Sequence, residues 1–176
     1  MRNFYLRELG PRDAALIGDA EALIYGSENP GLINGTEDFR AELSEAEEAD
    51  QGFSVGVFDN DSGRLIAYMI CYRKQSDFNC GDVAYISDIA VFEDCRGTLH
   101  HPREGNLFTT MLRWLAGHTL RLRLPIEAEC RTRIRDLLRK HPHLPGNFGY
   151  LLVHERFLPE YFGGEDFFWL RFEVDT

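Results

Sequence analysis

A single carboxylate interrupts one of the most apolar segments of the sequence. Asp88 stands within residues 83–92, a run dominated by apolar side chains. Burying a carboxylate without a partner is costly, and carboxyl groups in such surroundings often have the shifted proton affinity that acid–base chemistry requires. Two interpretations stay open. Asp88 serves an amine substrate as base or anchor, or it is a strand residue that is hydrogen-bonded or paired with an arginine.

Two further carboxylates, Glu127 and Glu129, alternate with the apolar residues Ile126, Ala128 and Cys130. Such alternation predicts a strand, and its period of two puts both glutamates on one face. These side chains either line the site of an acceptor or are simply solvated.

Arginines and glycines follow the apolar run, directly before a helical pattern. Arg96 and Gly97 begin this segment, and Arg103, Gly105 and Asn106 end it. The first N–H groups of a helix attract anions, and glycine lets the backbone approach a phosphate closely. Residues 95–140 carry a net charge of +6 in a chain whose total is −10. These features predict an anion site.

Seven strands and four helices are predicted to position these residues. Pro11 starts the first helix, and Thr36 is the predicted N-cap of the second. The order is β-α-α-β-β-β-α-β-α-β-β, an α/β (α+β) mixed sheet with helices on its faces. No repeat or linker divides the chain, so we expect a single domain of residues 1–176. The predicted strands cover residues 3–8, 53–57, 65–72, 83–92, 125–130, 148–153 and 167–174.

Residues 84–97, which read AYISDIAVFEDCRG, carry a resemblance to a known family. They resemble the fourth strand and following loop of the GCN5-related N-acetyltransferases (GNAT), whose element order also matches. The resemblance implies that the backbone of Ile89, Ala90 and Val91 pairs with the pantetheine arm of acetyl-coenzyme A. It also implies an expanded pyrophosphate loop, whose ligands would be Arg96, Gly97, Thr98, Arg103, Gly105 and Asn106.

The implied activity is transfer of an acetyl or other acyl group from coenzyme A to an amine, by direct attack in a ternary complex. Asp88 or Glu129 would aid deprotonation of the amine. The family often carries a tyrosine acid on the helix after the fifth strand, where this chain has none, so Tyr150 or Tyr161 would take that role. The alternative is an inert protein of the same fold that binds a protein or a ligand.

Composition limits the partners. Overall acidity makes nucleic acid an unlikely default partner, and no apolar stretch is long enough to span a membrane. The acidic N-terminal helices favour a cationic acceptor, a small molecule or a lysine.

The histidines lack zinc-ligand spacing, so no metal is expected. Cysteine usage predicts a reduced, cytoplasmic protein. The C-terminal aromatic residues are predicted to be mostly core, although an excess at an edge can form a homodimer contact.

The basic run of residues 121–140 has three interpretations. It contacts a coenzyme A phosphate, it binds RNA or an acidic protein, or it is a solvated helix face paired with local acids.

Overall fold

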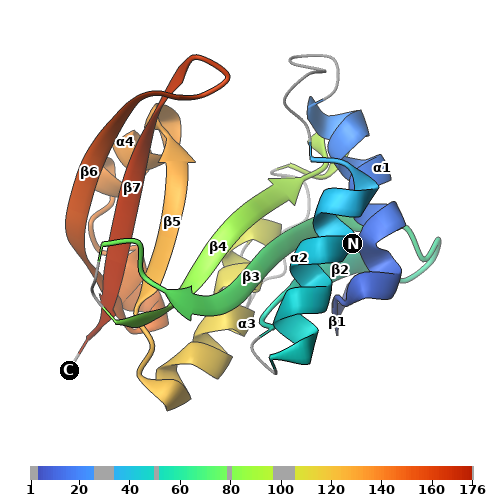
Figure 1. The fold of residues 1–176 in the computed structure, drawn as a ribbon, viewed down its shortest axis with the longest axis horizontal. Helices are drawn as coiled ribbons and strands as arrows, with labels where there is room; N and C mark the ends of the chain where they lie inside the picture. The colour runs from blue at the N-terminus through green and yellow to red at the C-terminus, as the bar shows by residue number, and fades with distance from the viewer. Residues whose placement is uncertain (1–3, 26–33, 50–51, 79–80, 97–105, 176) are drawn as a thin grey trace.

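Seven strands form one mixed sheet in the order β1-β2-β3-β4-β5-β7-β6. The computed structural model describes residues 4–25, 34–49, 52–78, 81–96 and 106–175. Strands from both ends of the chain belong to this sheet, and the predicted order of strands and helices is confirmed (Figure 1). The strands are β1 (Phe4–Glu8), β2 (Val55–Asp59), β3 (Leu65–Gln75), β4 (Asp82–Val91), β5 (Ile126–Arg131), β6 (Tyr150–Phe162) and β7 (Glu165–Val174).

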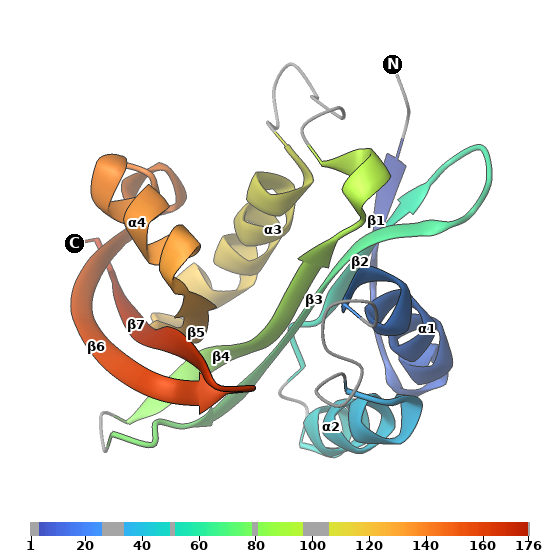
Figure 2. The same ribbon diagram turned by 90° about the horizontal axis from the view of Figure 1, so that it is seen from above.

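Four helices cover the two faces of the sheet. Helices α1 (Ala14–Tyr25) and α2 (Thr36–Glu48) lie on one face, and α3 (Leu107–Leu122) and α4 (Thr132–Lys140) lie on the other (Figure 2). Each face has its own apolar core. The core under α1 and α2 contains Ile17, Phe39, Leu43, Tyr68, Ile70 and Ala90, and the core under α3 contains Met69, Cys71, Ile86, Met111 and Leu115.

Strands β4 and β5 pair only over a short stretch and then separate. Their parallel pairing joins Ala84 to Ile126 and Ile86 to Ala128. Beyond these pairs the two strands run apart (Figure 1). The separation begins at an irregularity, because Ile70 of β3 pairs with Asp88 whereas the next residue, Cys71, pairs with Ile86. Ser87 is thus an extra residue in β4, and a bulge of this kind bends a strand away from its neighbour.

Some boundaries differ from the sequence-based expectations. Gly35, not Thr36, caps α2, and its N–H donates to Asp38 at 2.8 Å. Strand β6 continues to Phe162, well beyond the predicted end at residue 153, and turns into β7 through Gly163 and Gly164, both with positive φ. Because β6 is an edge strand, three aromatic side chains predicted to be core are exposed, namely Phe157, Tyr161 and Phe162.

Within the described ranges, no helix has the length and apolar character needed to cross a membrane.

Candidate active site

Asp88 lies on β4 directly after the bulge, on the face covered by α1 and α2. Its Oδ2 atom accepts a hydrogen bond from the Tyr68 hydroxyl at 3.0 Å. Tyr68 comes from the centre of β3 and is fully buried. Its hydroxyl also forms a hydrogen bond with Oε2 of Glu21, a residue of α1 whose exposed fraction is 6%. Two carboxyl groups and one phenol therefore meet in a largely buried cluster.

Proton affinities in this cluster are shifted. Burial and the nearby Glu21 carboxylate raise the pKa of Asp88 to about 7, against the opposing effect of the Tyr68 hydrogen bond. Burial also raises the pKa of Glu21, while hydrogen bonds and Arg131 counteract the rise. A carboxyl group that titrates near neutrality is suited to take a proton from an amine.

Further titratable groups surround the pair. Burial and the charges of Asp88 and Glu21 raise the pKa of Tyr25 to about 12. The Arg131 guanidinium lies 5.9 Å from the centre of the Tyr25 ring and forms an ion pair of 3.2 Å with Glu165. Glu42 of α2 also acts on Asp88 electrostatically. The cluster therefore draws on both helices, on β3 and on both separating strands.

Glu129 lies on β5, on the same face of the sheet as Asp88. Its Oε2 atom accepts a hydrogen bond from the Tyr85 hydroxyl, and burial raises the pKa of Glu129. The Nζ atom of Lys74 lies 3.9 Å from the centre of the Tyr85 ring, and the Tyr72 ring meets the same ring edge-on at 5.8 Å. Asp88 and Glu129 thus stand on the two strands that separate.

The other predicted glutamate of β5 has a structural role. Glu127 is only 1% exposed, and its Oε1 atom accepts hydrogen bonds from Arg171 at 2.8 Å and from Ser76 at 2.7 Å. The expectation that its side chain is solvated is therefore wrong, and a place for it at the acceptor site stays a prediction. Both glutamates point to one face as predicted, and the Arg171 guanidinium of β7 pairs with Glu127 and, at 2.7 Å, with Glu173.

Tyr150 lies away from Asp88 and Glu129. Its hydroxyl hydrogen-bonds to the Thr119 hydroxyl at 2.6 Å and to the Leu124 carbonyl at 3.0 Å. Leu124 precedes β5, whereas Glu129 is near the other end of that strand. This buried residue therefore joins α3 to the start of β5, and its role as acid stays a prediction.

The residues expected to hold coenzyme A are placed in part. Ile89, Ala90 and Val91 form the last segment of β4, where Ala90 is buried and the Val91 carbonyl accepts a hydrogen bond of 2.9 Å from Nε of Arg96. Asn106 caps α3 by accepting from the N–H of Thr109 at 2.9 Å. The expected ligands Gly97, Thr98, Arg103 and Gly105 lie outside the described residues.

Sequence reasoning missed Glu21 and Tyr68. Glu21 is a carboxylate beside the apolar positions Ile17, Ala20 and Ile24 of one helix, and Tyr68 is a polar group within a continuous apolar strand. Each is a buried polar residue without a local partner, which is the same signal that singled out Asp88.

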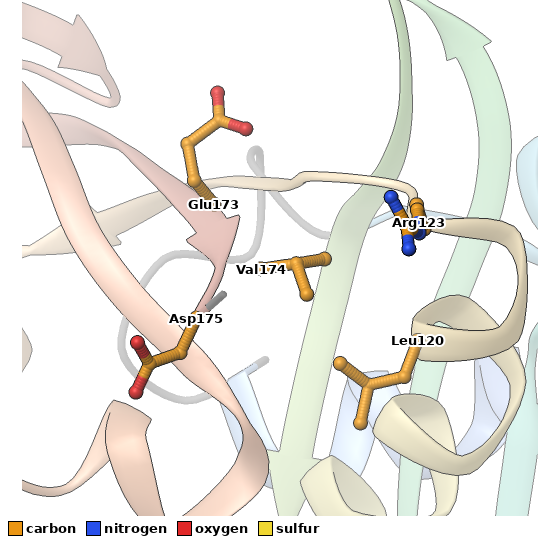
Figure 3. A pocket seen from close by; sticks show the side chains of 5 residues that line it. All are labelled: Leu120, Arg123, Glu173, Val174 and Asp175. Atoms are coloured by element: carbon orange, nitrogen blue, oxygen red, sulfur yellow. The ribbon is translucent and has the colours of Figure 1, made fainter.

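A pocket of about 520 Å³ lies between the C-terminal end of α3 and the C-terminal end of β7 (Figure 3). None of the residues that line it belongs to the cluster around Asp88. The lining residues are Leu120, Arg123, Glu173, Val174 and Asp175.

Comparison with solved structures relates this arrangement to known proteins. A GNAT-family acetyltransferase from Streptococcus pneumoniae is 14% identical, with a TM-score of 0.63 over 99% of this chain and 100% of the other. Drosophila melanogaster polyamine N-acetyltransferase is 11% identical, with a TM-score of 0.64 over 98% and 100%. Arabidopsis thaliana Naa50, in complex with the bisubstrate analogue CoA-Ac-MVNAL, is 12% identical, with a TM-score of 0.61 over 96% and 97%.

These likenesses concern the fold. No family model and no curated protein matches the sequence. The resemblance detected in residues 84–97 is therefore supported by architecture, and the chain has the fold of GNAT-family acetyltransferases.

Proposed function

We propose that this chain, which has the GNAT acetyltransferase fold, transfers an acyl group from coenzyme A to an amine, with acetyl-coenzyme A as the expected donor. The observation that carries the proposal is Asp88, a largely buried carboxyl with a pKa of about 7 at the point where β4 leaves β5. An amine attacks a thioester only when its nitrogen is unprotonated, so a nearby base that works at neutral pH is needed.

Asp88 would take the first proton from the ammonium group of the acceptor. The freed nitrogen then forms a bond to the thioester carbonyl carbon, and the carbon–sulfur bond breaks. The second proton leaves the nitrogen and ends on the departing sulfur, so the products are an amide and a free thiol. Asp88 returns its proton to the solvent before the next turnover.

The separating strands supply a place that fits the acyl donor. In the described residues the pairing of β4 with β5 ends at Ile86, so residues 88–91 present the β5-side edge of β4 to the space that opens. Ser87 at the bulge has a buried hydroxyl oxygen without a hydrogen-bond partner in the described structure. Unpaired strand edges bind extended chains through their amide groups, as the pantetheine arm requires. When bound, acetyl-coenzyme A supplies the reactive thioester.

The acceptor would be a cationic amine, either a small molecule or a lysine side chain. Four half-buried or buried carboxyl groups lie on the face that holds Asp88, and they come from α1, α2, β4 and β5. They are Glu21, Glu42, Asp88 and Glu129. One structural neighbour is a polyamine N-acetyltransferase and another was solved with the bisubstrate analogue CoA-Ac-MVNAL, which supports an amine as the acceptor.

An acetylation assay with acetyl-coenzyme A and a panel of amines tests the proposal. We expect transfer by the unmodified chain and a loss of about 10²-fold or more in kcat/KM for Asp88→Asn. The control is Asp19→Asn, which removes an exposed carboxylate from the same face of the molecule and should leave kcat/KM unchanged. Absence of transfer, together with no heat of acetyl-coenzyme A binding in calorimetry, would favour an inert protein of the same fold.

We further propose that the chain acts as a single domain in the cytoplasm. The sheet that unites both ends of the chain supports the first statement. The free thiols of Cys71, Cys95 and Cys130 are consistent with a reducing compartment.

A further inference from the structure

The Tyr68 hydroxyl links two carboxyl groups and has only one proton to share. It hydrogen-bonds to Glu21 from α1 and to Asp88 from β4. An ionised carboxylate can only accept a hydrogen bond. Both contacts are therefore hydrogen bonds only when one of the two carboxyl groups is protonated. The geometry implies that the cluster holds one additional proton at neutral pH.

The surroundings favour Asp88 as the holder of this proton. Glu21 accepts a hydrogen bond from the backbone N–H of Asn34 and faces the positive charge of Arg131, so its ionised form is stabilised. Asp88 faces a second carboxylate, Glu42 of α2, which disfavours a negative charge there. The chain of donors then runs from the Asp88 carboxyl to the Tyr68 oxygen, and from the Tyr68 hydroxyl to Glu21.

We propose that Glu21 is a positioning residue for acyl transfer, whose negative charge acts on Asp88 through space and through Tyr68 and gives Asp88 the proton affinity of a base. The inference rests on the proposed role of Asp88 as base. In this arrangement Glu21 remains ionised while Asp88 alternates between its two protonation states. Among the described residues, Tyr25 of α1, Glu42 of α2 and Arg131 of β5 also face the pair, and Arg96 after β4 acts on Tyr25.

The pH profile of kcat/KM for Glu21→Gln tests this role. Glutamine keeps the size of the side chain and one oxygen that can accept from the Tyr68 hydroxyl, but it removes the charge. Loss of a neighbouring like charge should move the acidic midpoint of the profile to lower pH by about one unit. The rate above the midpoint should fall several-fold because the base is weaker. Asp19→Asn, on the exposed side of the same helix, should leave the midpoint in place.

A second measurement does not depend on activity. Difference infrared spectroscopy of the full chain should show the carbonyl band of a protonated carboxyl below pH 7, and this band should be absent in Asp88→Asn. In Glu21→Gln the band should titrate at lower pH. In Tyr68→Phe it should move to higher frequency, because the protonated group has lost its acceptor.

The two measurements separate the possible failures. If the chain transfers acyl groups but Glu21→Gln leaves both the profile and the infrared titration unchanged, the role of Glu21 is overturned while acyl transfer stands. If the infrared band titrates as expected but no amine is acylated, the proposed function fails. The role of Glu21 in acyl transfer then fails with it, and only the proton shared by Glu21, Tyr68 and Asp88 is supported.

Discussion

Three acidic residues, of which Glu21 and Glu127 are buried and Asp88 is half-buried, show how a partner decides what a carboxyl group can do. Glu127 faces a guanidinium at 2.8 Å, so its charge is neutralised by a group that stays protonated. Glu21 and Asp88 instead face one another across a phenol, so their joint charge is relieved by a proton. The first arrangement stabilises a charge permanently, whereas the second binds and releases a proton near neutral pH.

The ion pair of Glu127 and Arg171 should be important for stability. We expect Glu127→Ala to lower the free energy of unfolding by about 2 kcal/mol, because it removes the buried partner of the Arg171 guanidinium, which then keeps its ion pair of 2.7 Å with the more exposed Glu173. The control is Glu37→Ala on α2, whose carboxylate is 81% exposed in its pair with Arg40 and should contribute less than about 1 kcal/mol. Urea titrations measure both values. Equal losses in the two variants would contradict a special role for the buried pair.

Asp88 should impose a pH dependence on stability that its substitution removes. Its pKa in the folded protein, about 7, lies above its usual value, so the folded state binds the proton more tightly than the unfolded chain. Its contribution is therefore fully present below about pH 4 and is lost as pH rises through 7. Asp88→Asn should be close to the unmodified protein at pH 4 and exceed its unfolding free energy by roughly 4 kcal/mol at pH 8, as the rise of the Asp88 pKa from 3.8 to about 7 implies. Thermal unfolding across this range checks the sign, and a difference that does not change with pH would refute it.

Sequence reasoning identified Asp88 but not its partners. A carboxylate in an apolar strand requires a partner, and the sequence left open whether this is an amine substrate, a hydrogen-bonding group or an arginine. The actual partner is Tyr68, which lies 20 residues away in sequence, and Tyr68 in turn reaches Glu21 over 47 residues. Contacts of this kind depend on how α1 packs across the sheet, and no local pattern in the sequence encodes that placement.

At the scale of elements, the position of Glu21 depends on a close contact between α1 and α2. A Cβ atom at Gly18 would lie 2.9 Å from the backbone nitrogen of Thr36, the first residue of α2. Backbone cannot yield as a flexible side chain can, so only glycine permits this approach. The order of the strands could be predicted from the sequence, but the length of β6 could not. This edge strand is exposed over much of its length, so it lacks the apolar alternation that marks a buried strand.

Gly18→Ala should therefore disturb both stability and the site. Overpacking costs about 1–3 kcal/mol, which exceeds the gain of about 1 kcal/mol in helix propensity. The displaced α1 should also lower acyl transfer, because Glu21 lies one turn further along the same helix. The control is Gly117→Ala in α3, where a Cβ atom meets nothing within 4 Å and only the gain in propensity remains. Chemical unfolding with a parallel activity assay compares the two variants, and a stabilised Gly18→Ala protein would show that the helices can separate freely.

At the scale of the whole molecule, the charge distribution differs from its sequence-based interpretation. Part of the basic run of residues 121–140 is paired with local acids, since Arg131 meets Glu165 at 3.2 Å, Arg135 meets Asp136 at 3.2 Å and Arg139 meets Glu155 at 2.7 Å. These ion pairs agree with the third of the three interpretations of the run, and the other two stay predictions. The acidic excess of residues 1–50, a net charge of −8, lies mainly in the elements that cover the face of Asp88. The sum of charges in a segment could be read from sequence, but which charges neutralise one another depends on the register of β6, β7 and α4.

A molecule with a net charge of −10 and an acidic site should select acceptors by charge, in a way that salt weakens. We expect KM for a diamine with two positive charges to rise about fivefold between 50 and 500 mM NaCl, and KM for a monoamine of similar length to rise by less than about twofold. Glu42→Gln should reduce the salt dependence for the diamine, because Glu42 acts on Asp88 from α2. Glu48→Gln, an exposed residue at the end of the same helix, serves as the matched control with the same change in net charge. Steady-state kinetics over this range measure the effect. An equal response of both amines to salt would mean that the acidic face only solvates the molecule and that other contacts select the acceptor.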